Sequence, residues 1–179
     1  MTLLVRDEED ILAANLDFHL SQGVDFFIIT DNLSVDGTRG IIDSYVRRKL
    51  AVRLDEPTDD YSQARWVTRM ARMAAVDYRA DWVINNDADE FWVGASSAGL
   101  KRDLAAVAPH VQSLLVPRFN FVPVDFAGAG FFAERMTLRE RQSYNSEGQP
   151  LPPKACHRAC PDIEVDQGNY LNRGELYLV

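Results

Sequence analysis

Three carboxylates fall within four residues of the segment INNDADEFWVG, residues 84–94. Asp87 and Asp89 are separated by one residue, and Glu90 follows directly. Because alternate residues of an extended segment point in the same direction, Asp87 and Asp89 can present two hard oxygen ligands to one cation. Mg²⁺ or Mn²⁺ suits such a pair, with phosphate oxygens and water completing the coordination shell. The structural alternative is that Asp87 forms a turn and Asp89 caps a helix.

The Asp-x-Asp spacing is weak evidence until its position in the chain is considered. With 18 aspartates among 179 residues, roughly two such triplets arise by chance. This triplet follows an apolar run, Trp82-Val83-Ile84, which predicts a buried strand. Its significance depends on which other side chains the fold brings to the end of that strand.

Strands and helices are predicted to alternate in the first half of the chain. Short apolar runs predict four strands, over residues 2–5, 24–30, 51–54 and 81–85. Residues with helical periodicity lie between them, so we expect an α/β fold with a mostly parallel sheet and helices on both faces. Ligands of such sheets bind at the carboxyl ends of the strands. The loops predicted at that edge span residues 6–10, 31–38, 55–63 and 86–91.

Turn and cap residues suggest where the helices begin and end. Asp7 and Asp10 have the spacing of an N-cap and an N3 residue, and Asp36 is a second candidate N-cap. Gly23 suits the position after a helix end. After residue 92 the pattern is less regular, and we expect one domain with an irregular C-terminal part. The elements predicted there are a helix over 97–107, a strand over 110–121 and mixed structure over 126–138.

Composition and charge exclude several classes of protein. The chain is 46% hydrophobic, enough for the core of one domain of ordinary size. Its formal net charge is −8, from 27 acidic and 19 basic residues, which argues against a nucleic-acid partner. No transmembrane segment or signal peptide is predicted, so we expect a cytoplasmic protein, with peripheral membrane contact left open. Because the chain stops within the apolar run GELYLV, we also expect a truncated version of something larger.

The cysteines and histidines give weaker signals. Cys156 and Cys160 are too few for a disulfide framework and favour a reducing compartment. Together with His157 they supply three zinc ligands in five residues, but no matching second pair exists, so zinc is disfavoured. His19 and His110 are interpreted as ordinary packed or exposed residues.

The loop after the first strand argues against other phosphate-binding folds. Its sequence, RDEED, has no glycine, whereas dinucleotide folds and P-loops need glycines there so that the backbone can cradle phosphates. A nucleotidyl- or phosphotransferase on a similar sheet is a lesser alternative for the same reason. At the end of the second strand, the Asp31 carboxylate can accept a hydrogen bond from a nucleobase, or form a plain Asx turn. Arg65, at the start of the third helix, can reach a phosphate or simply face solvent.

These segments together resemble a known enzyme family. The resemblance is carried by VRDEEDILAANLDFHLSQGVDFFIITDNLSVDGT, INNDADEF and KACHRACPDIEVDQGN. They are similar to family 2-like glycosyltransferases of the GT-A fold, in particular the bacterial subgroup whose acidic motif reads DADEF. The resemblance covers nearly the whole chain. It implies a Rossmann-like GT-A domain with a nucleotide-sugar-binding half, residues 1–92, and an acceptor-side half, residues 93–179.

The resemblance also implies roles for individual residues. Asp89 would be the main metal ligand, and Asp87 would contact the metal or the ribose. Asp31 matches the position that contacts the nucleobase. The other implied substrate-binding residues are Val5, Arg6 and Glu8 around the base and ribose, Arg65 near the diphosphate, and Lys154 and Arg158 in the K…HR segment.

The implied reaction moves a sugar from a nucleotide-diphosphate sugar, with UDP or GDP as carrier, to a hydroxyl of a glycan, lipid or protein acceptor. Mn²⁺ or Mg²⁺ would neutralise charge on the leaving diphosphate. A carboxylate would deprotonate the acceptor hydroxyl, giving inversion. Glu134 is the first candidate for this base, and Asp125 and Asp162 are the others.

One position departs from the family pattern. Related sequences read GNH where this chain has Gly168-Asn169-Tyr170, and the histidine is a natural third metal ligand. Tyrosine is a poor substitute for it. The alternative function is therefore a non-catalytic sugar-nucleotide or glycan-binding module of the same fold.

Overall fold

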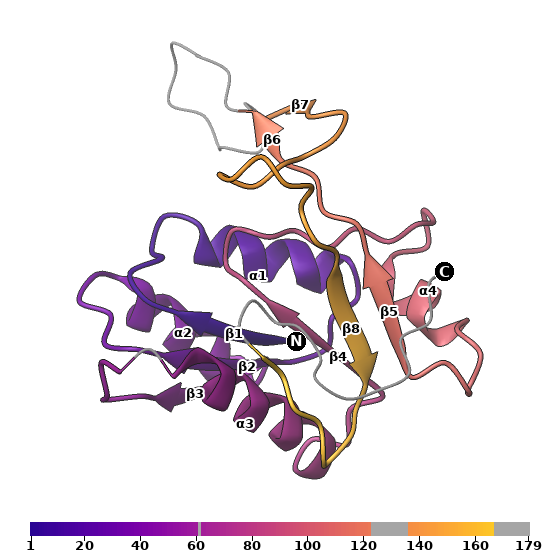
Figure 1. The fold of residues 1–179 in the computed structure, drawn as a ribbon. Helices are drawn as coiled ribbons and strands as arrows, with labels where there is room; N and C mark the ends of the chain where they lie inside the picture. The colour runs from indigo at the N-terminus through magenta and orange to yellow at the C-terminus, as the bar shows by residue number, and fades with distance from the viewer. Residues whose placement is uncertain (61, 123–135, 167–179) are drawn as a thin grey trace. The chain divides into compact units, whose positions relative to one another are not determined.

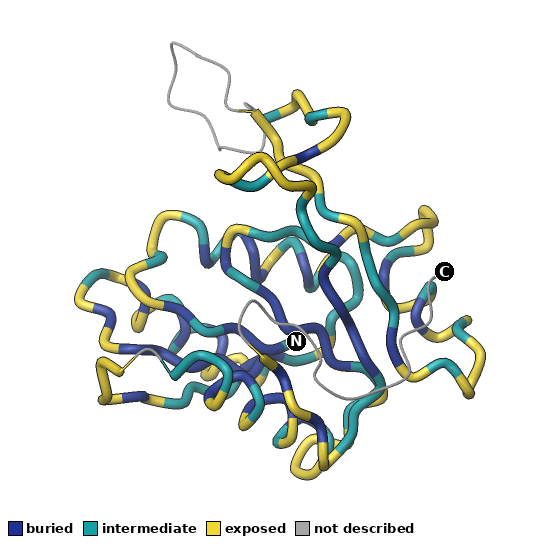
Figure 2. Tube along the Cα trace, viewed as in Figure 1, coloured by how far each residue is buried: buried dark blue, intermediate teal, exposed yellow. Residues whose placement is uncertain are grey.

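The computed structural model describes residues 1–60, 62–122 and 136–166. The chain forms two compact units, one comprising Met1–Leu114 with Ala155–Val179 and the other Leu115–Lys154. The chain returns to the first unit after leaving it, and the predicted division into binding halves at residue 92 stays a prediction. Buried residues in the first unit concentrate along the strands, as Figure 2 shows.

A six-stranded sheet organises the first unit. In spatial order its strands are β3 (Ala51–Asp55), β2 (Phe27–Asp31), β1 (Thr2–Val5), β4 (Trp82–Asn86), β8 (Lys154–Arg158) and β5 (Ser113–Val116). The four N-terminal strands pair in parallel, and β8 runs antiparallel to β4 (Figure 1). The predicted α/β fold with a mostly parallel sheet is confirmed.

Helices cover both faces of this sheet. They are α1 (Leu12–Ser21), α2 (Thr38–Arg47), α3 (Gln63–Val76) and the short α4 (Leu100–Ala105). Because side chains alternate along a strand, Phe27 and Ile29 pack with α1 and α2, whereas Ile28 packs with α3. Among the described residues, no helix is long and apolar enough to cross a membrane.

The helix boundaries test the predicted caps. Gly23 has a φ of +93° after the end of α1, and a Cβ there would lie 2.7 Å from the Lys101 Cβ, so the glycine is required. The prediction that Asp7 caps the first helix is wrong, because α1 begins only at Leu12. The N-cap of α2 is Gly37 and not the predicted Asp36, which lies one residue earlier and whose Oδ1 accepts a hydrogen bond from the Thr38 N–H at 2.9 Å.

The second unit contains a small antiparallel ribbon. Its strands are β6 (Phe121–Val122) and β7 (Leu138–Arg139). The strand predicted over 110–121 is instead two strands, β5 and β6, separated by irregular chain over residues 117–120. Three predicted positions lie outside the described residues: the candidate bases Glu134 and Asp125, and Tyr170, which stands where related sequences have a histidine.

Candidate functional site

The four parallel strands end at a common edge of the sheet, as predicted. Asp31, the last residue of β2, is in register with Val5 of β1 and with Asp55 of β3. On the other side of β1, Leu3 is in register with Asn86, the last residue of β4. The loops that follow these strands therefore share one edge, which carries the predicted acidic motif.

The loops after β1 and β2 are joined by five hydrogen bonds. Backbone N–H groups of residues 7–9 donate to side chains of the second loop, and two N–H groups of the second loop donate back. The bonds run from Asp7 N to Ser34 Oγ (3.0 Å), Glu8 N to Thr38 Oγ1 (2.8 Å), Glu9 N to Asp36 Oδ2 (3.1 Å), Val35 N to Asp7 Oδ1 (2.7 Å) and Gly37 N to Glu9 Oε2 (2.6 Å). This reciprocal pairing explains why Asp7 is not a helix cap, and it holds the Glu8 backbone at the sheet edge.

Negative charge is concentrated around Glu8. Burial raises the pKa of the Glu8 carboxyl, and the neighbouring Asp89, Asp10, Asp36 and Asp87 raise it further. The structure thus brings the predicted residues Glu8, Asp87 and Asp89 into one electrostatic environment. Mutual repulsion among hard oxygen donors is what a divalent cation would relieve, so the donor chemistry fits Mg²⁺ or Mn²⁺.

The number of protein ligands is small. Within the described ranges, no three His, Cys, Asp or Glu side chains form a group that could hold a metal ion. A cation bound by Asp87 and Asp89 would therefore take its remaining ligands from water and from a phosphate-bearing substrate. This matches the way Mg²⁺ is commonly bound, by one or two carboxylates together with substrate phosphates.

The acidic motif itself forms a turn. The Glu90 N–H donates to the Asp87 carbonyl at 3.1 Å, and Asp89 is exposed at the turn while Asp87 is partly buried. The helix-cap alternative for Asp89 is wrong, because the next helix begins only at Leu100. The two carboxylates are thus carried by a short loop directly after a central strand.

Two buried residues of α1 form hydrogen bonds to the backbone of this loop. Asn15 Nδ2 donates to the carbonyls of Ala88 and Glu90, both at 2.8 Å. His19 Nε2 accepts from the Trp92 N–H at 3.0 Å, and His19 Nδ1 lies 2.8 Å from the Asn15 carbonyl. Burial lowers the pKa of His19 to about 4, so the ring is neutral near pH 7.

Sequence reasoning placed His19 among ordinary histidines and did not single out Asn15. His19 is indeed packed, and both residues are fully buried. A signal was available: Asn15 and His19 lie four residues apart, beside Leu12 and Leu16 on the apolar face of a helix. Polar side chains at such positions require hydrogen-bond partners.

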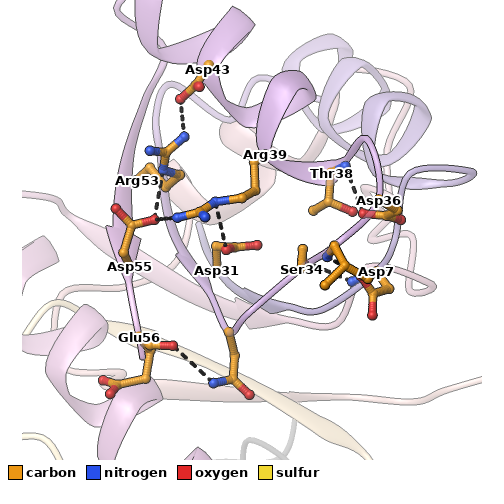
Figure 3. Close-up of polar contacts among 12 residues, drawn as sticks. Asp7, Asp31, Ser34, Asp36, Thr38, Arg39, Asp43, Arg53, Asp55 and Glu56 are labelled. Carbon is orange, nitrogen blue, oxygen red and sulfur yellow. Dashed lines mark hydrogen bonds and ion pairs between the residues drawn. The ribbon is translucent and has the colours of Figure 1, made fainter. Parts of the chain in front are cut away.

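On the β2 side of the edge, Asp31 is a buried carboxylate. Its side chain is 1% exposed, and within the described part of the chain neither oxygen accepts a directed hydrogen bond. Its charge is balanced by an ion pair with Arg39, whose Nε lies 3.2 Å from Asp31 Oδ2 and whose side chain is 46% exposed. Arg39 also pairs with Asp55 at 2.5 Å, and Asp55 in turn pairs with Arg53 at 3.1 Å (Figure 3). Arg39 could not be predicted as part of the site, because an arginine in the first turn of an amphipathic helix is normally a solvent-facing residue.

The predicted residues Val5, Arg6 and Arg65 have other surroundings. Val5 is buried in the core between α1 and α2 and the sheet. Arg6 pairs with Asp59 at 2.6 Å, and both side chains are exposed. Arg65 is exposed in the first turn of α3, where it lines a shallow groove of about 640 Å³ that runs along this helix.

The structure does not bring Arg158 to the acidic edge. Arg158 pairs with Trp82, the first residue of β4, and therefore lies at the opposite end of that strand from Asp87. Its guanidinium donates to the Val107 carbonyl at 3.0 Å and lies over the Trp82 ring at 4.5 Å, so its surroundings do not support a substrate contact. Asp162 follows the same end of β8, which does not support it as the catalytic base, whereas Lys154 begins β8 and is buried.

The zinc interpretation of KACHRAC has no geometric support. Cys156 and His157 are consecutive residues of β8 and point to opposite faces of the sheet. Burial raises the pKa of the Cys156 thiol to about 12, so the thiolate that zinc requires is disfavoured. Instead, His157 Nε2 lies 3.3 Å from Asn85 Nδ2, and His157 Nδ1 lies 2.8 Å from the Arg158 carbonyl.

Comparisons with known proteins agree with this arrangement. The model of one family, described as glycosyltransferase family 92, matches residues 2–138. No curated protein sequence matches the chain. The structure of residues 1–349 of TarS from S. aureus superposes with a TM-score of 0.61 and 14% identity, over 99% of this chain and 56% of that chain.

Two further TarS structures contain ligands. The structure in complex with UDP has a TM-score of 0.53 and 16% identity, over 72% of this chain and 37% of that one. The structure in complex with UDP-GlcNAc has the same TM-score and identity, over 72% and 36%. At these identities the likeness shows the fold alone. The chain spans little more than half the length of the longest-matching TarS structure and about a third of the other two.

Proposed function

The chain belongs to glycosyltransferase family 92, and we propose that it transfers a sugar from a UDP-sugar to an acceptor hydroxyl, with a divalent cation and with inversion. The observation that carries this proposal is the buried Asp31 carboxylate, without a directed hydrogen bond, on the same sheet edge as the Asp87–Asp89 turn. The complexes of TarS with UDP and UDP-GlcNAc support UDP as the carrier. The finer likeness to DADEF-type family 2 enzymes stays a prediction.

The spacing of the two acidic elements suits a nucleoside diphosphate. Strand β1 lies between β2 and β4, so Asp31 and the Asp87–Asp89 turn are two strand spacings apart, roughly 10 Å. A buried carboxylate accepts the N–H of a uracil ring, which would supply the directed hydrogen bond that the ion pair with Arg39 does not. The same molecule would extend its diphosphate across β1 toward Asp87 and Asp89.

The chemistry follows from these positions. Asp87 and Asp89 would hold Mn²⁺ or Mg²⁺, which when bound would offset the charge on the leaving diphosphate. The acceptor oxygen would form a bond to the anomeric carbon while the bond from that carbon to the diphosphate oxygen breaks, with inversion. The acceptor proton would pass to a carboxylate, for which Glu134 and Asp125 stay candidates. The acceptor, whether glycan, lipid or protein, is not specified by these residues.

Calorimetry tests the proposal. UDP, GDP and UDP-GlcNAc are titrated into wild type and Asp89→Ala, with and without Mn²⁺, and release of UDP from the donor is followed separately. We expect wild type to bind UDP more tightly with Mn²⁺ and to prefer UDP over GDP, and we expect Asp89→Ala to lose the Mn²⁺ dependence. Asp25→Asn is the matched control, because Asp25 is an exposed carboxylate preceding β2, at the opposite edge.

Three outcomes would change the conclusion. If wild type binds no nucleotide under either condition, the donor-site proposal is wrong. Mn²⁺-dependent UDP binding without release of UDP from any donor would instead identify a non-catalytic sugar-nucleotide-binding module. A preference for GDP would overturn the assignment of the carrier and leave the transferase proposal in place.

A further inference from the structure

The hydrogen bonds between α1 and residues 87–92 determine which His19 nitrogen carries the proton and how the Asn15 amide is oriented. Trp92 N–H is a donor, so His19 Nε2 must be the unprotonated ring nitrogen, and Nδ1 carries the proton. Nδ1 then donates to the Asn15 carbonyl at 2.8 Å, with Asn15 Oδ1 at 3.0 Å. This orients the Asn15 amide so that both Nδ2 hydrogens face the carbonyls of Ala88 and Glu90.

Other contacts tie the same segment to the same helix. Asn86 Nδ2 donates to the Glu90 carbonyl at 3.1 Å and lies 3.4 Å from Asn15 Oδ1. The Phe91 ring stacks on His19, with ring centroids 6.1 Å apart. The backbone of residues 88, 90 and 92 is therefore fixed on its inner side, while the Asp89 side chain is exposed on the outer side.

We propose that Asn15 and His19 are positioning residues, which set the backbone of residues 87–92 so that Asp87 and Asp89 hold the diphosphate–cation complex. This inference rests on the proposed function. Neither side chain contacts substrate in this arrangement. Each acts by satisfying buried backbone groups that would otherwise favour a different loop conformation.

Two substitutions of His19 separate hydrogen bonding from packing. His19→Gln keeps both functions, since the Gln amide can donate to the Asn15 carbonyl and its oxygen can accept from Trp92 N–H. His19→Leu fills a similar volume with an apolar side chain and removes both hydrogen bonds. His157→Leu is the matched control, because it also removes a buried, hydrogen-bonded histidine from the same compact unit, but His157 hydrogen-bonds Asn85 rather than the acidic turn.

The readout is the difference between UDP and uridine binding, measured calorimetrically with Mn²⁺. We expect His19→Leu to weaken UDP binding at least about 10-fold relative to His19→Gln, as the loss of a supporting shell does at metal sites. Uridine binding, which uses Asp31, should change less than about twofold. His157→Leu should keep the wild-type ratio of UDP to uridine affinity even if it melts at a lower temperature.

A second measurement is independent of nucleotide. Hydrogen exchange of the peptide covering residues 86–93 is compared in ligand-free wild type, His19→Leu and His19→Gln, with faster exchange expected only in His19→Leu. If His19→Leu does not fold, Asn15→Ser replaces it, since serine is too short to reach the two carbonyls. Unchanged exchange and an unchanged UDP-to-uridine ratio would overturn the positioning role. Faster exchange in His19→Leu, combined with a wild-type protein that binds no nucleotide, would support the positioning role and locate the failure in the proposed function instead.

Discussion

The two sides of the candidate site are held by different interactions. On the β4 side, the acidic turn is held by buried, neutral hydrogen bonds from Asn15 and His19. On the β2 side, Asp31 is balanced by Arg39, an exposed residue that also pairs with Asp55. Neutral hydrogen bonds in the interior depend on exact geometry, whereas an ion pair with one half-exposed partner is partly screened by water and salt.

This difference indicates different roles in ligand binding. The turn that carries Asp87 and Asp89 is preorganised, which suits a site that must place charge accurately. Arg39 keeps its partner Asp55 when it moves away from Asp31, and the buried Asp31 carboxylate then needs a ligand N–H in its place. We therefore expect the diphosphate side to be rigid and the base side to adjust when ligand enters.

Removing charge from the rigid side should have the largest effect. Asp89→Asn keeps the shape of the side chain and removes its charge, so we expect Mn²⁺-dependent UDP affinity to fall about 1,000-fold, or about 4 kcal/mol. Calorimetric titration of UDP and uridine checks this. Uridine affinity should stay unchanged, and an equal loss for both ligands would show that the substitution perturbs the whole site.

The second-largest effect is expected from low pH, which should destabilise the β4 side through His19. The folded-state pKa of His19, about 4, lies below its ordinary value of 6.5, so its contribution to stability is complete above pH 6.5 and is lost as the pH falls toward 4. A shift of this size corresponds to about 3 kcal/mol. Urea unfolding at pH 7 and pH 4.5 measures it as the difference between wild type and His19→Gln, because glutamine does not titrate. A difference that is constant with pH would contradict a neutral His19.

On the base side, Asp31→Asn should weaken uridine and UDP by the same factor. Asparagine replaces a charge-assisted acceptor with a neutral one, and we expect a loss of about 2 kcal/mol, or about 30-fold, with or without Mn²⁺. The comparison with Asp89→Asn is informative, because only the metal-side variant should discriminate between the two ligands. An Mn²⁺-dependent loss of affinity in Asp31→Asn would contradict this assignment and place Asp31 beside the metal instead of the base.

The smallest effect is expected at Arg39. Arg39→Gln removes an ion pair in which Arg39 is half exposed and Asp31 is buried, so the free energy of unfolding should fall by about 1.5 kcal/mol, between the values for exposed and buried pairs, and the change should shrink in 1 M salt. Urea unfolding at low and high salt measures this, with Arg53→Gln as the control on the same network. A larger, salt-insensitive loss would show that the β2 side is as rigid as the β4 side.

Much of the fold could be predicted because its signals are local. Apolar runs of four to seven residues indicated the four parallel strands, and Gly23 marked a helix end through its own backbone conformation. The Asp7 cap failed for a related reason: the same Asp-x-x-Asp spacing that suggests a helix start also permits the hydrogen bonds to the β2–α2 loop that the folded chain forms. Local spacing cannot rank these two outcomes.

The candidate site was predictable in part. Asp31, Asp87 and Asp89 could be placed at one edge because the ends of parallel strands coincide. Arg158 was assigned to the site from a family pattern, but the antiparallel direction of β8 carries it to the far end of β4. A sequence motif does not reveal strand direction, and the pairing of a late strand depends on the whole sheet.

The sequence by itself determined which side chains lie at the carboxyl ends of the strands, because alternation of apolar runs and helices defines a parallel sheet. Only the tertiary structure decided what supports them. His19 reaches the backbone of Trp92 across 73 residues of chain, and Arg39 approaches Asp31 only once α2 packs beside β2. Such contacts join residues with no periodic relation, so they exist only after the helices have packed on the sheet.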